Sequence, residues 1–171
     1  MRAPQKAIFI ILILASCVGC DQVTKSAAQK HLTSSQPVYL LGDVLRFQHS
    51  RNKGAILGLG ADLPDALRFW LLIVGVGIVL IGTLWFVWVS QEMSHPMGLL
   101  GGSMIVGGGF SNLIDRLLND GKVVDFMNVG VGALRTGIFN LADVAIMTGT
   151  GLLLAWSVFF RGSEGQEGDD V

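Results

Sequence analysis

Charged residues are scarce in this chain of 171 residues: Asp, Glu, Lys and Arg make up only 15% of it, whereas hydrophobic residues make up 51%. The mean hydropathy is +0.57, and in soluble domains about a quarter of the residues are charged. This shortage of charge excludes a water-soluble globule. The formal net charge of −1 and the lack of any basic block also lead us to expect no nucleic-acid partner.

Cysteine and histidine are rare as well, with two and three copies. Cys17 and Cys20 lie inside an apolar run that offers no further His or Cys to complete a zinc site, so we interpret them as apolar side chains. None of His31, His49 and His95 has a motif around it, which disfavours a Ser-His-Asp set. We therefore expect neither a metal nor a cofactor.

Long apolar runs are what the sequence has in abundance. Four of them can cross ~30 Å of hydrocarbon at ~1.5 Å per residue, and we predict membrane spans over about residues 7–26, 69–89, 97–114 and 138–160. The predicted fold class is an all-α membrane protein with four transmembrane helices, in which residues 1–160 form one polytopic domain. Residues 161–171 are Gly, Ser and acidic residues, which predicts a disordered acidic tail.

The connection between the first two spans contains strand signals over about residues 38–60. Gly42-Asp43 marks a turn, the alternation of Leu45, Phe47 and His49 follows it, and Asn52-Lys53-Gly54 marks a second turn. We therefore predict a small β-rich subdomain between helices 1 and 2.

The orientation in the membrane is ambiguous from the residues alone. An even number of spans puts both termini on one side, with three basic residues there (Arg2, Lys6 and Arg161) and nine on the other side. The positive-inside rule, counted in this way, places the termini outside. A basic start before an apolar run is instead typical of a signal anchor with a cytoplasmic N-terminus.

The first 20 residues also allow a different interpretation. Leu14-Ala15-Ser16-Cys17 has the residue types of a lipobox, which would make the chain itself a lipoprotein. Three further spans make a lipid anchor redundant, so we favour a first membrane helix.

Acids at the ends of the spans are the most unusual feature, because an acid at mid-bilayer costs on the order of 3 kcal/mol. The third span ends with Asn112 and Asp115, and the fourth begins with Asn140 and Asp143. Residues three apart share a helix face, and the two spans run in opposite directions, so we expect these faces to meet at one depth. Asp125 stands between Val-Val and Phe-Met, an apolar run that should hold it against the same membrane mouth.

Each of these acids also has a structural explanation. Helix capping accounts well for Asn140 but poorly for Asp143, which we expect about one turn inside an apolar helix. Asp115 could form a plain interfacial ion pair with Arg116.

A functional explanation is a pair of carboxyls in a cleft of low dielectric constant, which share one proton. The ionised member can take a proton from water while the protonated member donates to a carbonyl oxygen, as in an aspartic peptidase. A proton-coupled transporter and a non-catalytic membrane chaperone are the alternatives. The sequence around the two Asn-Leu-x-Asp motifs does not repeat, which disfavours the transporter, and a chaperone has no use for paired acids.

Five short blocks, in this order, resemble those of the lipoprotein signal peptidase (signal peptidase II) family, and the resemblance covers about residues 7–160. The blocks are Asp21-Gln22-Val23-Thr24-Lys25, Asn52-Lys53-Gly54-Ala55, Asn112-Leu113-Ile114-Asp115-Arg116, Val123-Val124-Asp125-Phe126 and Phe139-Asn140-Leu141-Ala142-Asp143. The chain departs from the family pattern at Ser111, where glycine is usual, and at Ile56-Leu57, where an aromatic residue is usual.

The resemblance implies a membrane aspartic endopeptidase that cleaves diacylglyceryl-modified prolipoproteins on the N-terminal side of the lipidated cysteine. It implies that Asp125 and Asp143 are the catalytic pair. The residues that it implies support the site or bind substrate are Asp21, Lys25, Asn52, Gly54, Asn112, Asp115, Arg116 and Asn140.

The same resemblance implies the partners and the location. We expect lipidated prolipoproteins as substrates, contact with membrane phospholipid, inhibition by globomycin and a monomeric state. We also expect the bacterial cytoplasmic (inner) membrane, with cytoplasmic termini and an active site near the periplasmic face, against the count of basic residues.

Overall fold

The computed structural model describes residues 2–55 and 59–159 of the chain. The predicted acidic tail, residues 161–171, and the departure at Ile56-Leu57 lie outside the described residues. Four helices are long and apolar enough to cross a membrane: Ala3–His31, Asp65–Val89, Pro96–Leu118 and Leu141–Phe159. They confirm the four predicted spans, with boundaries that shift by a few residues.

The first and third of these spans are the single helices α1 (Ala3–His31) and α4 (Pro96–Leu118). The second is continuous but made of three parts, α2 (Asp65–Arg68), the π-helical η2 (Phe69–Gly75) and α3 (Val76–Val89). A 3₁₀ turn, η3 (Glu92–Ser94), leads into α4, and the last span is α5 (Leu141–Phe159).

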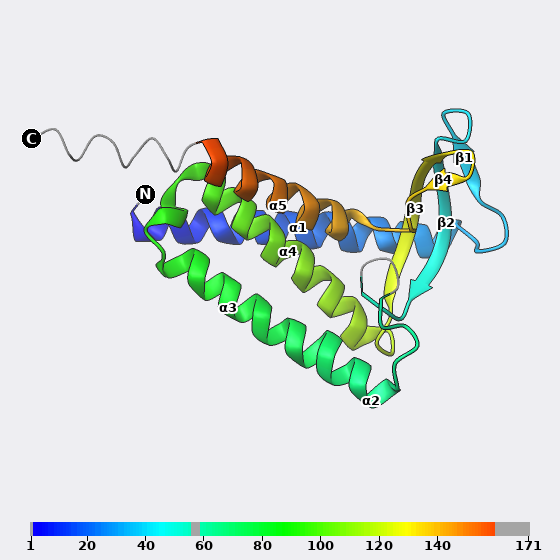
Figure 1. The fold of residues 1–171 in the computed structure, drawn as a ribbon, viewed down its shortest axis with the longest axis horizontal. Helices are drawn as coiled ribbons and strands as arrows, with labels where there is room; N and C mark the ends of the chain where they lie inside the picture. The colour runs from blue at the N-terminus through cyan, green and yellow to red at the C-terminus, as the bar shows by residue number, and fades with distance from the viewer. Residues whose placement is uncertain (1, 56–58, 160–171) are drawn as a thin grey trace, which may run out of the picture.

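Helix α4 forms the centre of the bundle and packs against α1, α3 and α5 (Figure 1). It is much more buried than the other three spans, because glycines let its neighbours approach closely. At the contact with α5, a Cβ on Gly101 would lie 2.7 Å from the Gly149 carbonyl oxygen, and a Cβ on Gly108 would lie 2.4 Å from that of Ala142. The start of α5 is thereby held against the half of α4 nearer the sheet.

A four-stranded antiparallel sheet lies across one end of the bundle, and the start of α1 and the end of α5 lie together at the opposite end (Figure 1). The strand order is β1-β2-β3-β4. The strands are β1 (Val38–Leu40), β2 (Leu45–Asn52), β3 (Val123–Val131) and β4 (Leu134–Arg135).

The predicted subdomain between helices 1 and 2 is therefore only half of the sheet. Strands β1 and β2 confirm the strand signals, but the second strand ends at Asn52, and β3 and β4 come from the connection between α4 and α5. Residues 123–126 of β3 are all buried, so the first part of this strand has none of the in-and-out alternation by which strands are usually found in a sequence. Pairing of β2 with β3 sets Ser50 opposite Asp125.

The contact between α4 and α5 yields a stability prediction. In the variant Gly149→Ala, the added Cβ would lie 2.5 Å from the Gly101 carbonyl oxygen, so the helices must separate, and we expect a loss of about 1–3 kcal/mol of stability. Unfolding of the purified protein in detergent, followed by circular dichroism, measures it. Gly151→Ala is the matched control, because a Cβ there meets nothing within 4 Å; equal stability of the two variants would contradict the close packing.

Candidate active site

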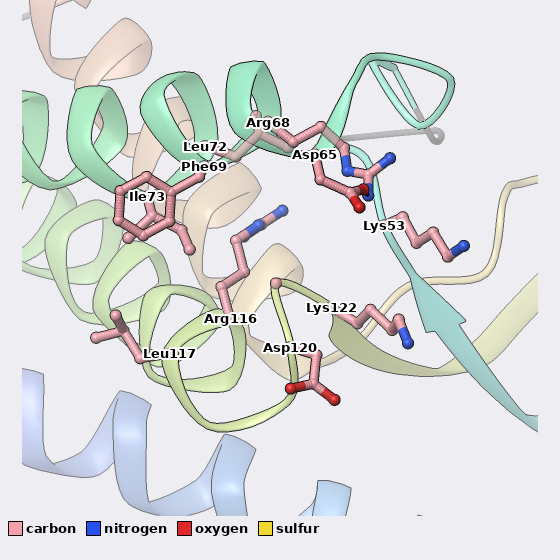
Figure 2. A pocket seen from close by; sticks show the side chains of 11 residues that line it. Lys53, Asp65, Arg68, Phe69, Leu72, Ile73, Arg116, Leu117, Asp120 and Lys122 are labelled. Carbon is pink, nitrogen blue, oxygen red and sulfur yellow. Dashed lines mark hydrogen bonds and ion pairs between the residues drawn. The ribbon is translucent and has the colours of Figure 1, made fainter.

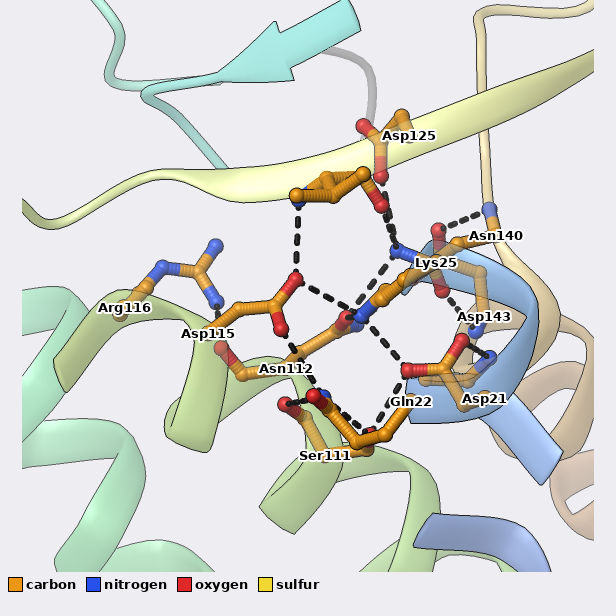
Figure 3. A network of polar contacts seen from close by, with 12 residues as sticks. Asp21, Gln22, Lys25, Ser111, Asn112, Asp115, Arg116, Asp125, Asn140 and Asp143 are labelled. Carbon is orange, nitrogen blue, oxygen red and sulfur yellow. Dashed lines mark hydrogen bonds and ion pairs between the residues drawn. The ribbon is translucent and has the colours of Figure 1, made fainter. Parts of the chain in front are cut away.

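Polar side chains from four segments meet where the sheet joins the bundle (Figure 3). The segments are the second half of α1, the end of α4, the start of β3 and the start of α5. The structure brings together the predicted site residues of these segments, and seven of them are at least nine-tenths buried: Asp21, Lys25, Asn112, Asp115, Arg116, Asp125 and Asn140.

Lys25 stands at the centre of this network. Its Nζ lies 2.6 Å from Asp21 Oδ2 and 3.0 Å from Asp115 Oδ2, and it donates a hydrogen bond of 2.9 Å to Asn112 Oδ1. A buried ammonium needs this much compensation, because its desolvation costs several kcal/mol. Lys25 therefore pairs with Asp21 on its own helix and ties α1 to α4 through the Asp115 carboxylate and the Asn112 amide.

Asp21 links α1 to α5. Its Oδ1 accepts a hydrogen bond of 2.9 Å from the backbone N–H of Ala142, in the first turn of α5, and its Oδ2 accepts one of 2.7 Å from the Ser111 hydroxyl. A carboxylate at this position satisfies a free N–H group and is favoured by the helix dipole. Asp21 thus holds the helix start that carries Asp143.

Asp115 holds strand β3 in place. Its Oδ2 accepts a hydrogen bond of 2.9 Å from the backbone N–H of Val124, and its Oδ1 accepts one of 2.9 Å from Gln22 Nε2. The structural alternative for Asp115, an ion pair with Arg116, is wrong: the ion-pair partner of Asp115 among the described residues is Lys25. Successive helix residues point about 100° apart, which lets Asp115 turn toward α1 while Arg116 turns away.

The side-chain amide of Asn112 has a defined orientation. Its Oδ1 accepts from Lys25 and from Asn140 Nδ2 (3.1 Å), so its Nδ2 is left to donate to Asp143 Oδ1 at 3.0 Å. Lysine carries only donors, and its position therefore determines which end of the Asn112 amide faces Asp143.

Asn140 precedes α5 and caps it. Its Oδ1 accepts from the backbone N–H of Asp143 at 2.9 Å, while Asp143 Oδ2 accepts from the backbone N–H of Asn140 at 3.1 Å. This reciprocal pair is a capping box, so the expectation that capping explains Asp143 poorly is wrong, and Asn140 does not share a helix face with it. The helix begins at Leu141, which places Asp143 in its first turn.

Asp125 and Asp143 lie on either side of Asn140. Asn140 Nδ2 donates a hydrogen bond of 2.7 Å to Asp125 Oδ1, so one buried side chain contacts both acids. Asp125 is buried, whereas Asp143 is only partly buried. Burial and the neighbouring charge of Asp143 raise the pKa of Asp125 to about 6, although hydrogen bonds from Asn52 and Asn140 oppose the rise.

The Asn52–Gly54 turn packs against the end of α4. Asn52 Oδ1 accepts from the backbone N–H of Gly54 at 2.9 Å, and Arg116 Nη2 donates to the Gly54 carbonyl at 2.7 Å. Arg116 also faces the charges of Asp125 and Asp143. The structure thus brings Asn52, Gly54 and Arg116 to the rim of the two acids.

Two residues of the network were not predicted as site residues. Gln22 Nε2 donates to the Ser111 hydroxyl at 3.0 Å as well as to Asp115, and Ser111 donates to Asp21. Gln22 lies in the first of the five blocks, beside Asp21, and Ser111 stood out only as a departure from the family pattern. Their shared signal is a polar side chain within an apolar span, which calls for a partner.

Comparisons with known proteins agree with this architecture. A family model described as signal peptidase (SPase) II matches residues 13–160. The chain is 31% identical to a lipoprotein signal peptidase of Mycobacterium avium, over 92% of this chain and 83% of that protein. It is 32% identical to one of Mycobacterium tuberculosis, over 92% of this chain and 75% of that protein.

Two solved structures, each described as a bacterial membrane enzyme, have the same fold. One, at 2.3 Å resolution, gives a TM-score of 0.77 at 25% sequence identity and covers 95% of this chain and 93% of that chain. The other, at 1.9 Å, gives a TM-score of 0.72 at 25% identity and covers 88% and 93%.

The four spans, the sheet and these comparisons define a multi-pass membrane protease. The chain belongs to the signal peptidase II family, which cleaves signal peptides from prolipoproteins in lipoprotein maturation.

The central position of Lys25 leads to a second stability prediction. In the variant Lys25→Met, two buried carboxylates lose their counter-charge, and breaking a buried ion pair from one side costs about 3–5 kcal/mol. Unfolding in mixed detergent micelles measures the loss. Lys30→Met is the control, since Lys30 lies on the same helix and is exposed; a loss as large for Lys30→Met would mean that the network around Lys25 adds nothing.

Proposed function

We propose that the chain is an aspartic endopeptidase whose catalytic residues are Asp125 and Asp143. The observation that carries this proposal is the bridge between the two acids, in which Asn140 donates to Asp125 and exchanges two hydrogen bonds with Asp143. The charge of Asp143 acts on Asp125, and two carboxyls that interact in this way take up and release protons as a pair.

Both acids accept hydrogen bonds from two N–H donors, so it is burial that supports different roles for them. Each Asp143 oxygen accepts an N–H donor, Oδ1 from Asn112 and Oδ2 from Asn140, and such donors favour the ionised form. Asp125 is the more buried of the two, and its raised pKa of about 6 favours the protonated form. Asp143 is therefore the general base and Asp125 the general acid.

Hydrolysis then follows without a metal or cofactor. Asp143 takes a proton from water, the resulting hydroxide attacks the carbonyl carbon of the scissile peptide bond, and Asp125 donates its proton to the carbonyl oxygen. When the tetrahedral intermediate collapses, the C–N bond breaks and the leaving nitrogen takes the proton held by Asp143, while one hydroxyl of the intermediate returns a proton to Asp125 as the carbonyl re-forms. The products are the free signal peptide and a new amino terminus on the cysteine.

The proposed substrate is a prolipoprotein whose cysteine carries a diacylglyceryl group, cleaved on the N-terminal side of that cysteine. Acyl chains contribute ~0.8 kcal/mol per CH₂ to membrane partitioning, so they hold the cysteine at the membrane surface. Asp125 lies in β3 and Asp143 in the first turn of α5, where the spans meet the sheet, which is the depth at which such a cysteine is presented.

The proposed location is the bacterial cytoplasmic membrane, with cytoplasmic termini and the sheet on the periplasmic side. The bundle supports one part of this arrangement, since the start of α1 and the end of α5 lie together at the end away from the sheet (Figure 1). Among the nine basic residues at the sheet end, Lys25 and Arg116 are buried in the network, which weakens the count of basic residues as a topology signal.

Removal of either acid tests the proposed mechanism. Asp125→Asn and Asp143→Asn should each lower kcat by about 10²–10⁴-fold on a lipidated precursor, because an amide cannot exchange the shared proton. The measurement is release of signal peptide by purified protein, and Asp120→Asn, an exposed acid at the same end, is the control. Turnover retained by either variant would remove that residue from the catalytic pair.

The substrate assignment is tested with the unmodified enzyme. A lipidated precursor should be cleaved, the same precursor without its diacylglyceryl group should not, a chelator should have no effect, and globomycin should inhibit. Equal cleavage of both precursors would overturn the lipid requirement but leave the two acids in place. No cleavage by folded protein would favour a transporter instead.

The pH dependence follows from the protonated form of Asp125. The group must carry its proton, so kcat/KM should fall by about tenfold per pH unit as the pH rises above about 6 in the free enzyme. Because the hydrogen bond from Asn52 lowers the pKa of Asp125, Asn52→Ala should move this alkaline limb to higher pH. If the alkaline limb stays at the same pH in Asn52→Ala, it does not report the protonation of Asp125.

Fusion reporters test the orientation. A reporter active only outside the cytoplasm should be active after Lys122, at the sheet end, and silent after Ser94, in the turn at the opposite end. The opposite result would support termini outside the cytoplasm, the orientation that the positive-inside count gives.

A further inference from the structure

A cavity of about 570 Å³ opens between η2 and the end of α4 (Figure 2). It lies on the far side of Arg116 from Lys25, and the proposed hydrolysis uses none of its other lining residues. Its position at the sheet end places it where the helices leave the hydrocarbon.

The cavity has one apolar and one charged end. Phe69, Leu72, Ile73 and Leu117 line it toward the bundle, and Lys53, Arg68 and Lys122 line it toward the sheet (Figure 2). Phe69 is 48% exposed and Leu117 62% exposed on membrane-spanning helices. The apolar end is therefore continuous with the lipid beside the bundle.

The charged end has an excess of cations. Two carboxylates line the cavity, Asp65 and Asp120, and the first pairs with Arg68, whose Nη1 also donates to the carbonyls of Ala61 and Leu63 at 2.9 Å each. Lys53 and Lys122 make no ion pair with any residue that the structure describes. Their ammonium groups are available to a ligand.

Arg116 adds a second, independent indication of a ligand. Its side chain is 9% exposed, and its Nε–H finds no hydrogen-bond partner within residues 2–55 and 59–159. An unpartnered buried donor is costly, and arginine is well suited to phosphate. Figure 2 shows this side chain reaching between the apolar and the charged ends.

We propose that this cavity binds an anionic phospholipid of the surrounding membrane. The phosphate lies against Lys53, Lys122 and Arg116, and an acyl chain follows Phe69, Leu72 and Leu117 into the bilayer. The ligand must be an amphiphile because one end of the cavity is apolar and the other is charged. Its headgroup must be negative because the cations at the charged end are in excess. Basic pockets between membrane helices recognise anionic headgroups in this way. The site lies outside the catalytic pair and does not depend on the proposed peptidase mechanism.

The test is lipid retention by the purified full-length protein, which needs no turnover. Protein in neutral detergent with equal amounts of phosphatidylglycerol and phosphatidylcholine, matched in acyl chains, is examined by native mass spectrometry. We expect one retained phosphatidylglycerol at about tenfold preference. The double variant Lys53→Gln/Lys122→Gln should lose this preference.

The control neutralises two exposed cations at the same end outside the cavity, as Lys30→Gln/Arg51→Gln, and should keep the preference. Equal loss in both double variants would reduce the effect to general surface charge and overturn the site. Unchanged thermal unfolding of both double variants establishes that they are folded.

Two competitors distinguish the source of the phosphate and the identity of the occupant. Glycerol phosphate should fail to displace the lipid; displacement at equal concentration would mean that the acyl chain contributes nothing and would overturn the lipid assignment. A diacylglyceryl-modified peptide should also leave the lipid bound. If the peptide displaces it one for one, the cavity belongs to the substrate's own chains and the proposal is wrong.

Discussion

The buried ammonium of Lys25 is the interaction on which the rest of the site depends. It lies within 3.0 Å of one oxygen on each of Asp21, Asp115 and Asn112. Two carboxylates at 0% and 3% exposure need a partner of opposite charge, because desolvation of an unpaired buried charge costs several kcal/mol. The same two carboxylates accept the backbone N–H groups of Ala142 and Val124.

These two backbone contacts explain how acids far apart in the chain come together. Val124 precedes Asp125 in β3 and Ala142 precedes Asp143 in α5, so each anchored N–H lies one residue before a candidate catalytic acid. Lys25 thereby positions both acids without touching either one. Such indirect positioning gives a more rigid pair than flexible side chains could achieve alone, because the anchored atoms belong to the main chain.

Much of this arrangement could be predicted from the sequence, and the limits have physical causes. Apolar runs marked the four spans, and acids at their ends marked the site, because both features are costly or impossible elsewhere. The pairing of Asp115 was predicted wrongly, since its partner Lys25 lies 90 residues away and only helix packing brings them together. Strand β3 was missed because its first residues are buried on both faces, and Asn140 was placed inside a helix that begins one residue later.

Ser111 illustrates how a departure from a family pattern can fit the same network. A glycine at this position would give Asp21 Oδ2 only Lys25 as a partner, whereas the Ser111 hydroxyl adds a donor at 2.7 Å and accepts from Gln22 at 3.0 Å. Gln22 also donates to Asp115, so the hydroxyl and the Gln22 amide together link the two carboxylates. The added side chain is fully buried, and a buried hydroxyl is stable only when it is hydrogen-bonded. The departure at Ser111 therefore extends the network around Lys25 and leaves the geometry of Asp125 and Asp143 to the same two backbone anchors.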